Sequence, residues 1–259
     1  MNKAVTLEVE GAIAWVTLNR PDALNAINNE VRDSLPQCIR GADADEAVRV
    51  IVVRGAGQRA FCAGADIKEF APVESLSKSR QARVQESWIR PFDETRKPLI
   101  ASIHGYCLGG GLEIALACDI RVAAKTATFA FPETGLGVIT GVGGSQRLPR
   151  IVGLGLALDM MLSGATLDAE RAFAVGLVSR IVNGDDLLTA TRALAETIAS
   201  KAPIANIYAK EAIKAGINLE LGSGLRMEAD LLTLLMNSED RLEAGKAFKE
   251  KRKPQFRGR

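Results

Sequence analysis

Three glycine-rich loops constrain the fold of this chain most strongly, because each one follows a short apolar run. The loops span residues 55–66, 105–113 and 133–146. Two of the runs, 48–53 and 99–103, are short and mostly apolar, as buried strands are. A glycine loop between a strand and a helix lets a ligand approach the backbone and leaves N–H groups free to donate. The recurring order of strand, glycine loop and helix therefore predicts an α/β fold whose loops can bind a ligand.

Apolar patterning outside the loops extends the α/β prediction to most of the chain. Further strands are predicted over 5–9, 13–18, 121–123 and 128–131, and helices over 28–40, 111–118, 144–163 and 187–201. From Pro203 onward the pattern is wholly helical, since apolar residues recur at helical spacing. We therefore divide the chain into an α/β core of residues 1–200, which holds the site, and a helical region of residues 201–259.

Charge is nearly balanced over the whole chain but not along it. The net charge of +2 indicates no overall electrostatic preference for nucleic acid or membrane. Residues 241–259 carry eight Lys or Arg and two acids, so this tail is either a solvated helix face or a local anion site. An RNA-binding role would need a larger basic surface with aromatic residues for stacking, whereas the tail offers only Phe248 and Phe256.

The cysteines and the N-terminus indicate a compartment. Cys38, Cys62, Cys107 and Cys118 show neither metal-binding nor redox spacing, which favours free thiols in a reducing environment. The N-terminus lacks the apolar segment of a signal peptide, and no apolar run approaches the roughly 18 residues of a membrane span. We expect a cytoplasmic protein with no metal ion and no nucleic-acid or membrane partner.

Partial motifs in the glycine loops raise other functions that the neighbouring residues disfavour. Residues 55–60 fit the dinucleotide-binding spacing, but residues 61–64 interrupt the helix that should begin there. Residues 141–144 lack the Lys-Ser/Thr pair of a phosphate-binding loop. His104 is the single histidine, so a Ser-His-Asp or Cys-His site would have to use it, and its place at a strand end favours a structural role.

Two glutamates in these loops are better candidates for chemistry. Glu113 lies in the otherwise apolar start of a helix, and a buried carboxylate costs several kcal/mol unless it is partnered. Glu133 follows Pro132 and precedes Gly135, in a loop that can present its side chain to a cleft. Such a pair of carboxyl groups in one cleft would suit general acid–base catalysis.

Six segments match one family in order and spacing. The chain resembles the crotonase superfamily of enoyl-CoA hydratases and isomerases along nearly its full length. The matching segments are 18–25 (LNRPDALN), 60–68 (AFCAGADIK), 104–115 (HGYCLGGGLEIA), 131–137 (FPETGLG), 143–148 (GGSQRL) and 248–254 (FKEKRKP).

The resemblance implies a spiral of ββα units with a helical C-terminal region, assembled as a trimer or as a dimer of trimers. It implies an acyl-CoA thioester as substrate, with no separate cofactor. Ala65 and Gly110 would supply two backbone N–H groups of an oxyanion hole, Glu113 and Glu133 would be the paired acid and base, and Gly141 would help to hold the attacking water. The residues implied to line the coenzyme A path or to lie near its phosphates are Ala23, Leu24, Ala63, Ile67, Arg59 and Lys251.

The reaction that this resemblance favours is hydration of a 2-enoyl-CoA to a 3-hydroxyacyl-CoA. An isomerase that only moves a proton between carbons can use a single acid, whereas this chain has two. The alternatives are an enoyl-CoA isomerase and a hydratase or dehydratase of a specialised cyclic or aromatic-pathway acyl-CoA. Three positions depart from the family pattern and bear on the substrate: Asp22 replaces a common basic residue, Phe131 a polar residue and Thr140 a proline.

Overall fold

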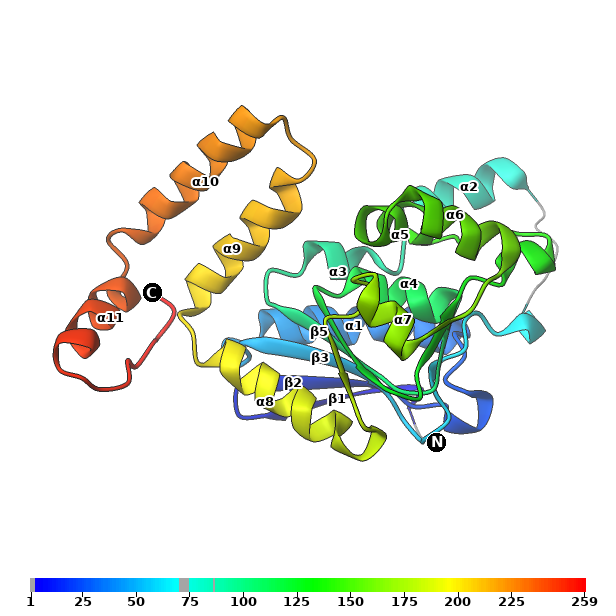
Figure 1. Cartoon of the computed structure of the whole chain (residues 1–259), viewed down its shortest axis with the longest axis horizontal. Coiled ribbons are helices and arrows are strands. Elements are labelled where there is room, and N and C mark those ends of the chain that lie inside the picture. The colour runs from blue at the N-terminus through cyan, green and yellow to red at the C-terminus, as the bar shows by residue number, and fades with distance from the viewer. Residues whose placement is uncertain (1–2, 70–74, 86) are drawn as a thin grey trace.

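Two β-sheets surrounded by helices form most of the protein, and an arm of three helices extends from them (Figure 1). The computed structural model describes residues 3–69, 75–85 and 87–259. The strands are β1 Val5–Glu10, β2 Ile13–Leu18, β3 Val50–Gly55, β4 Ala60–Cys62, β5 Leu99–Ile103, β6 Tyr106–Leu108, β7 Ile120–Ala124, β8 Thr128–Ala130, β9 Leu167–Asp168 and β10 Arg180–Val182.

The helices lie between and after these strands. The α-helices are α1 Asn29–Ala44, α2 Leu76–Gln85, α3 Arg90–Glu94, α4 Gly110–Ala117, α5 Gly144–Val152, α6 Leu154–Ser163, α7 Ala169–Ala174, α8 Leu187–Ala199, α9 Pro203–Gly216, α10 Leu221–Leu235 and α11 Glu239–Lys249. Short 3-10 helices are η1 Pro21–Ala23, η2 Ile67–Glu69, η3 Glu133–Leu136 and η4 Gly184–Asp186.

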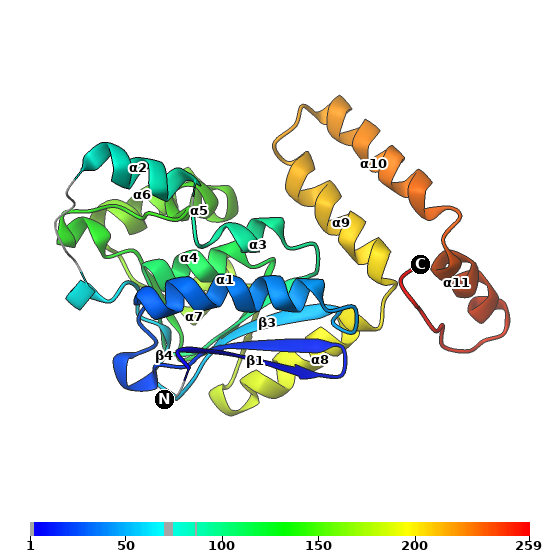
Figure 2. The same ribbon diagram turned by 180° about the vertical axis from the view of Figure 1, so that it is seen from behind.

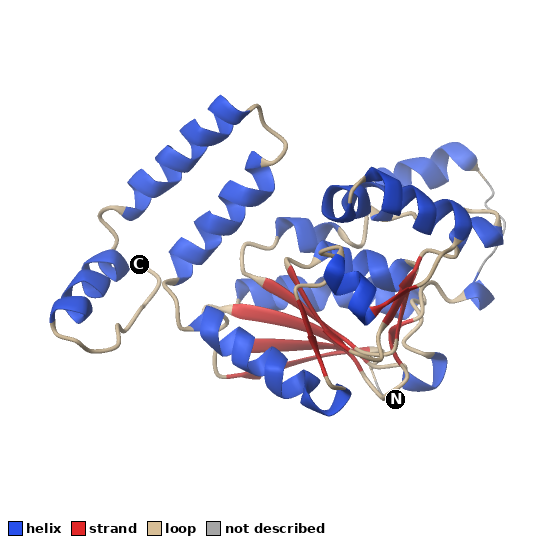
Figure 3. Ribbon diagram, viewed as in Figure 1, coloured by secondary structure: helices blue, strands red, loops and turns tan. Residues whose placement is uncertain are grey.

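The chain alternates between the two sheets, which makes the fold a spiral. The larger sheet has the order β1-β2-β3-β5-β7-β10 and is parallel except for β1. The smaller sheet has the order β4-β6-β8-β9, with β9 antiparallel. Each of β3, β5 and β7 joins the larger sheet, and the strand that follows it joins the smaller one before the chain enters helices (Figure 3). The predicted α/β spiral of ββα units with a helical C-terminal region is thus confirmed.

Helices cover both faces of the larger sheet, so its central strands are mostly apolar. In β3, Ile51 and Val53 point into the main core beside α1, whereas Val50 and Val52 point into a second cluster that α8 covers. Alternate residues of a strand face opposite sides, which explains why a short run of valine and isoleucine is buried completely.

One helix prediction is wrong in its extent. The sequence predicts a single helix over 144–163, but the structure has α5 and α6, separated at Gly153. Gly153 adopts φ 81° and ψ 162°, which ends the helical path and starts a new axis. The apolar periodicity continues across the break because both helices bury residues against the same core, Leu148 from α5 and Met160 from α6.

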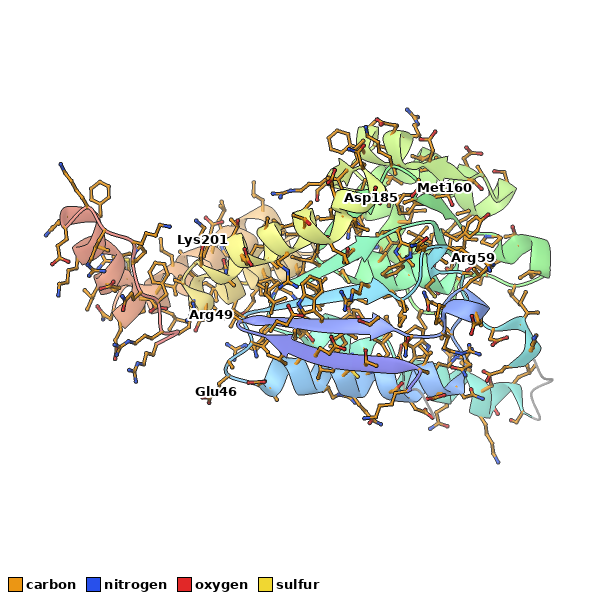
Figure 4. All side chains as sticks on the ribbon, turned by 90° about the horizontal axis from the view of Figure 1, so that it is seen from below. Glu46, Arg49, Arg59, Met160, Asp185 and Lys201 are labelled. Carbon is orange, nitrogen blue, oxygen red and sulfur yellow. The ribbon has the colours of Figure 1, made fainter. Side chains whose placement is uncertain are left out.

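The arm of α9, α10 and α11 extends away from the two sheets (Figure 2), and side chains at its base bind it to the core. Lys210 of α9 forms an ion pair of 2.8 Å with Asp119, and Arg49 donates to the carbonyl oxygens of Ala199 and Phe256 at 3.1 and 2.6 Å. Figure 4 shows Arg49 where the core meets this arm. Over the residues that the structure describes, no helix is long and apolar enough to cross a membrane.

Candidate active site

Two backbone N–H groups on adjoining loops have no acceptor among the residues that the structure describes. Ala65 follows β4 and Gly110 begins α4, and the pairing of β4 with β6 brings these loops together. A methyl group on Gly110 would lie 3.8 Å from the amide nitrogen of Ala65 and 2.9 Å from Ile27 Cδ1. Within the described part of the chain, neither Ala65 nor Gly110 donates its N–H to a hydrogen bond. Two such donors side by side can hold an oxygen that gains negative charge.

The loop that carries Ala65 is braced by an ion pair. Both terminal nitrogens of Arg20 lie 3.1 Å from Asp66 Oδ2. Ile27 donates its N–H to the carbonyl of Gly64 at 2.8 Å and accepts from the N–H of Asp66 at 3.0 Å, so backbone bonds flank Ala65 on both sides. The side-chain hydrogen bond from Arg20 lowers the pKa of Asp66, which keeps the pair ionised.

Glu113 lies in α4 one turn after Gly110, and its carboxylate is held by backbone. Its side chain is 3% exposed. Oε1 accepts from the N–H groups of Val142 and Gly144, both at 2.8 Å, and the backbone of Gly141 adds a further hydrogen bond. Burial raises the pKa of Glu113, while these N–H groups act in the opposite direction. The sequence prediction of a partnered, buried carboxylate here agrees with this geometry.

Glu133 begins η3 and lies on the other side of the same loops. A methyl group on Gly109 would lie 2.8 Å from Glu133 Oε1, and Gly109 has a φ of 51°, so only glycine fits this position. Glu133 Oε2 is buried and, among the described residues, has no hydrogen-bond partner. Burial, with a contribution from the charge of Glu113, raises the pKa of Glu133 to about 7. The two carboxyl groups therefore differ, because Glu113 Oε1 accepts N–H groups from a neighbouring loop, whereas Glu133 Oε2 has no partner among the described residues.

Two departures from the family pattern have local structural roles. Phe131 is buried in the main core, and a methyl group on Gly144 would lie 2.9 Å from its Cζ, so its ring supports the loop that holds Glu113. Thr140 accepts the N–H of Ser145 at 3.0 Å through its Oγ1 and closes the same loop. Asp22, the third departure, is exposed in η1.

Most of the residues assigned to the coenzyme path come together, but Lys251 does not. Ala63 donates its N–H to the carbonyl of Leu24 at 3.0 Å, which places both beside Ala65. Ala23 ends η1 and Ile67, 58% exposed, begins η2, on the same two loops. Arg59 is exposed before β4, at the end of the core remote from the arm (Figure 4). Lys251 follows α11, and within one chain α11 lies in the arm, away from α4 and the loops of the site (Figure 1).

Sequence reasoning assigned no role to three residues that hold this site. Arg20, Asp66 and Arg147 all lie inside the matching segments, which was the available signal. Their partners come from other segments, so the motifs alone do not indicate what they hold. In the described ranges no group of three or more His, Cys, Asp or Glu side chains could bind a metal ion.

A spiral of ββα units, in which two backbone amides have no acceptor among the described residues and lie near one buried and one half-buried glutamate, has the architecture of the crotonase superfamily. The chain belongs to the enoyl-CoA hydratase/isomerase family, which it matches over residues 8–259. It is 37% identical over 249 residues to the short-chain-enoyl-CoA hydratase of Clostridium acetobutylicum, covering 96% of this chain and 95% of that protein.

Two further similarities extend over nearly the full length. The (E)-benzylidenesuccinyl-CoA hydratase of Thauera aromatica is 40% identical, with 98% of this chain and 99% of that protein covered. The crystal structure of an enoyl-CoA hydratase from Bacillus anthracis superposes with a TM-score of 0.93 at 37% identity, covering 99% of this chain and all of that one. Both the sequence and the fold therefore place the chain among enzymes of this family.

Proposed function

We propose that the protein hydrates a 2-enoyl-CoA thioester to a 3-hydroxyacyl-CoA. The observation that carries this proposal is the pair of differently held carboxyl groups, Glu113 in the helix that Gly110 begins and Glu133 against the neighbouring Gly109. The protein's similarity to the short-chain-enoyl-CoA hydratase of Clostridium acetobutylicum and to the (E)-benzylidenesuccinyl-CoA hydratase of Thauera aromatica supports the same reaction class.

The free N–H groups of Ala65 and Gly110 would bind the thioester oxygen. When water adds to the β-carbon, the π electrons of the double bond move toward the carbonyl and the thioester oxygen becomes negative. Two preorganised N–H donors stabilise that charge, and the loss of one such donor commonly costs ~10²–10³ in rate. The glycine at position 110 leaves room for the thioester to lie against the backbone.

The two glutamates would divide the proton transfers. Glu113, whose carboxylate accepts backbone N–H groups, is suited to take the proton of the attacking water. Glu133, whose pKa is raised to about 7, is suited to deliver a proton to the α-carbon. The water loses one proton to Glu113, the α-carbon gains one from Glu133, and solvent exchange restores both groups. Gly141, next to Glu113, would help to hold the water.

The coenzyme would run over the loops that carry Ala23, Leu24, Ala63 and Ile67, with Arg59 near its phosphates. Lys251 would reach those phosphates from a second copy of the chain, because its own arm lies away from the site (Figure 1). Assembly into a trimer or a dimer of trimers would also cover the exposed apolar side chains of the arm. These are Ile213, Ile217, Leu221, Leu225, Leu232 and Leu234.

A specialised acyl-CoA is the second candidate substrate, and isomerisation the second candidate reaction. The 40% identity to (E)-benzylidenesuccinyl-CoA hydratase favours including an aromatic thioester among the compounds tested. Product analysis with crotonyl-CoA, a 3-enoyl-CoA and an aryl-substituted enoyl-CoA would separate the three possibilities. Formation of a 2-enoyl product from the 3-enoyl ester without hydration of crotonyl-CoA would favour the isomerase.

The deciding experiment compares wild type with Glu113→Gln and Glu133→Gln in the hydration of crotonyl-CoA. Each substitution keeps the shape of the side chain and removes its acid–base function. We expect each to lower kcat by about 10²- to 10⁴-fold, the usual contribution of a positioned acid or base. Near wild-type hydration by either variant would show that the two-carboxylate mechanism is wrong.

A further inference from the structure

The loop of residues 141–144, which holds Glu113, is rich in glycine, so its backbone has great conformational freedom. Val142 and Gly144 direct their N–H groups at the same oxygen of Glu113, which requires a sharp turn between them. Gly143 makes that turn with a φ of 113°. Glycine reaches this conformation without steric cost but does not hold it, because it has the largest conformational freedom in the unfolded chain. A further contact must therefore keep the two N–H groups convergent.

Arg147 of α5 supplies that contact. Its Nη1 donates to the carbonyl oxygen of Val142 at 2.7 Å, and its guanidinium lies directly against Gly143, where any Cβ would overlap it. The carbonyl of Val142 belongs to the peptide unit that joins Val142 to Gly143. Holding this carbonyl sets the plane of that peptide, and with it the directions of the flanking N–H groups that reach Glu113.

Asp93 of α3 fixes the other side of the same guanidinium. Nη2 of Arg147 lies 2.8 Å from Asp93 Oδ1 and 2.7 Å from Oδ2, while Nη1 serves the loop. The side chain of Arg147 is 21% exposed and that of Asp93 is 50% exposed, so the guanidinium is mostly shielded from solvent while the carboxylate is half open to it. A planar guanidinium held at both ends has little freedom to rotate, which an ammonium group could not reproduce.

Arg147 also acts on Glu113 through its charge. The positive charge lowers the pKa of Glu113 against the larger, opposite effect of burial. The other charged group near this carboxylate, among the residues described, is Glu133 of η3. The strands packed against α4 bring the thiols Cys62 and Cys107, which are neutral because burial raises the pKa of each.

We propose that Asp93 and Arg147 are positioning residues for the general base. They lock the peptide between Val142 and Gly143 so that two N–H groups converge on Glu113. This inference rests on the proposed function, since Glu113 acts as a base only if the enzyme hydrates its substrate. Neither residue touches the reacting atoms, and both act through the loop.

The test uses Arg147→Lys, Arg147→Met and Asp93→Asn, assayed with crotonyl-CoA across pH. We expect kcat to fall about 10- to 100-fold in all three, because misplacing a catalytic group by about 1 Å has an effect of this size. KM should change little, since no substrate contact is removed. The acid limb of the pH profile should move to higher pH in Arg147→Met, which loses the charge, and not in Arg147→Lys or Asp93→Asn, which keep the cation.

Matched controls come from the same helices. Arg150 of α5 donates to the carbonyl oxygen of Gln146 in its own helix, and Glu94 of α3 pairs with Arg90 on the surface. Arg150→Met and Glu94→Gln should therefore keep wild-type kcat and pH profile. Thermal unfolding of every variant shows whether it is folded. If Arg147→Met does not fold, kcat of Arg147→Lys tests the positioning role.

The outcomes separate this inference from the proposed function. A wild-type enzyme without hydratase activity, or an active Glu113→Gln variant, would overturn the proposed function and the positioning role with it. A wild-type hydratase with undiminished kcat in Arg147→Lys and Asp93→Asn would overturn the positioning role alone. A loss of kcat in these two variants that the controls do not share would support it.

Discussion

Glu133 carries a cost for the folded protein that can be measured without any substrate. The pKa of Glu133 lies at about 7 in the folded protein against an ordinary value of 4.5. One pKa unit corresponds to about 1.4 kcal/mol, so a fully buried group with this difference would lower stability by about 3 kcal/mol at alkaline pH. Because Glu133 is only half-buried, solvent screening reduces the expected effect to about 1–2 kcal/mol.

The direction of the effect follows from the proton balance. Between pH 4.5 and about 7 the folded protein keeps a proton on Glu133 that the unfolded chain has released. The stability that this group contributes when neutral is therefore lost as the pH rises through that window, and it stays lost above it. Glutamine is neutral throughout, so Glu133→Gln should match wild type near pH 4.5 and exceed its free energy of unfolding by about 1–2 kcal/mol at pH 8.

Urea unfolding of both proteins at pH 4.5, 6 and 8, at one protein concentration, measures this difference. Glu196→Gln, on the exposed face of α8, is the matched control and should show no such gain. Equal stability differences at pH 4.5 and pH 8, or a Glu133→Gln variant less stable than wild type at pH 8, would refute the reasoning. We expect Glu133→Gln to gain free energy of unfolding and to lose activity, as happens at other sites where function requires a destabilising group.

Three further expectations concern the oxyanion loops and the arm. Gly110→Val should lower kcat/KM by at least about 10²-fold for acyl chains of every length, because the branched side chain would crowd Ile27 and the thioester that all substrates share. Undiminished hydration of crotonyl-CoA by a variant with wild-type circular dichroism would contradict the oxyanion role. Asp66→Asn removes the anion that holds Arg20 and should lower kcat about tenfold, in steady-state assays at pH 7, by loosening the loop of Ala65. Lys251→Ala should raise KM for coenzyme A thioesters, less so at high salt, and an equal effect on substrates truncated to the pantetheine arm would contradict phosphate binding.

Sequence patterns predicted the fold elements well wherever they depend on local burial and turn chemistry. The run at 50–53 reads as a buried strand because both sheet faces are covered, and β3 has that environment. The sequence pattern did not predict the helix boundary at Gly153, because that pattern also depends on burial. Apolar spacing reports burial, and α5 and α6 bury residues in one core on both sides of the break.

The candidate site was foreseeable only in part. Glu113 and Glu133 drew attention because a carboxylate in an apolar helix start and one in a glycine loop are unusual in sequence. Their nearness, and the difference between them, depend on contacts that no local pattern contains. Glu113 receives N–H groups from a loop that the spiral brings to α4, while Oε2 of Glu133 has no hydrogen-bond partner in the described structure.

By itself, the sequence determined the strand and helix types, the glycine loops and the six segments that mark the family, because these follow from short-range periodicity and backbone freedom. Only the tertiary structure decided which loops meet. The pairing of β4 with β6 sets the N–H of Ala65 beside that of Gly110, and α3 and α5 bring Asp93 to Arg147. Such convergence depends on strand order and helix packing between segments far apart in the chain, and that is information which residue spacing does not carry.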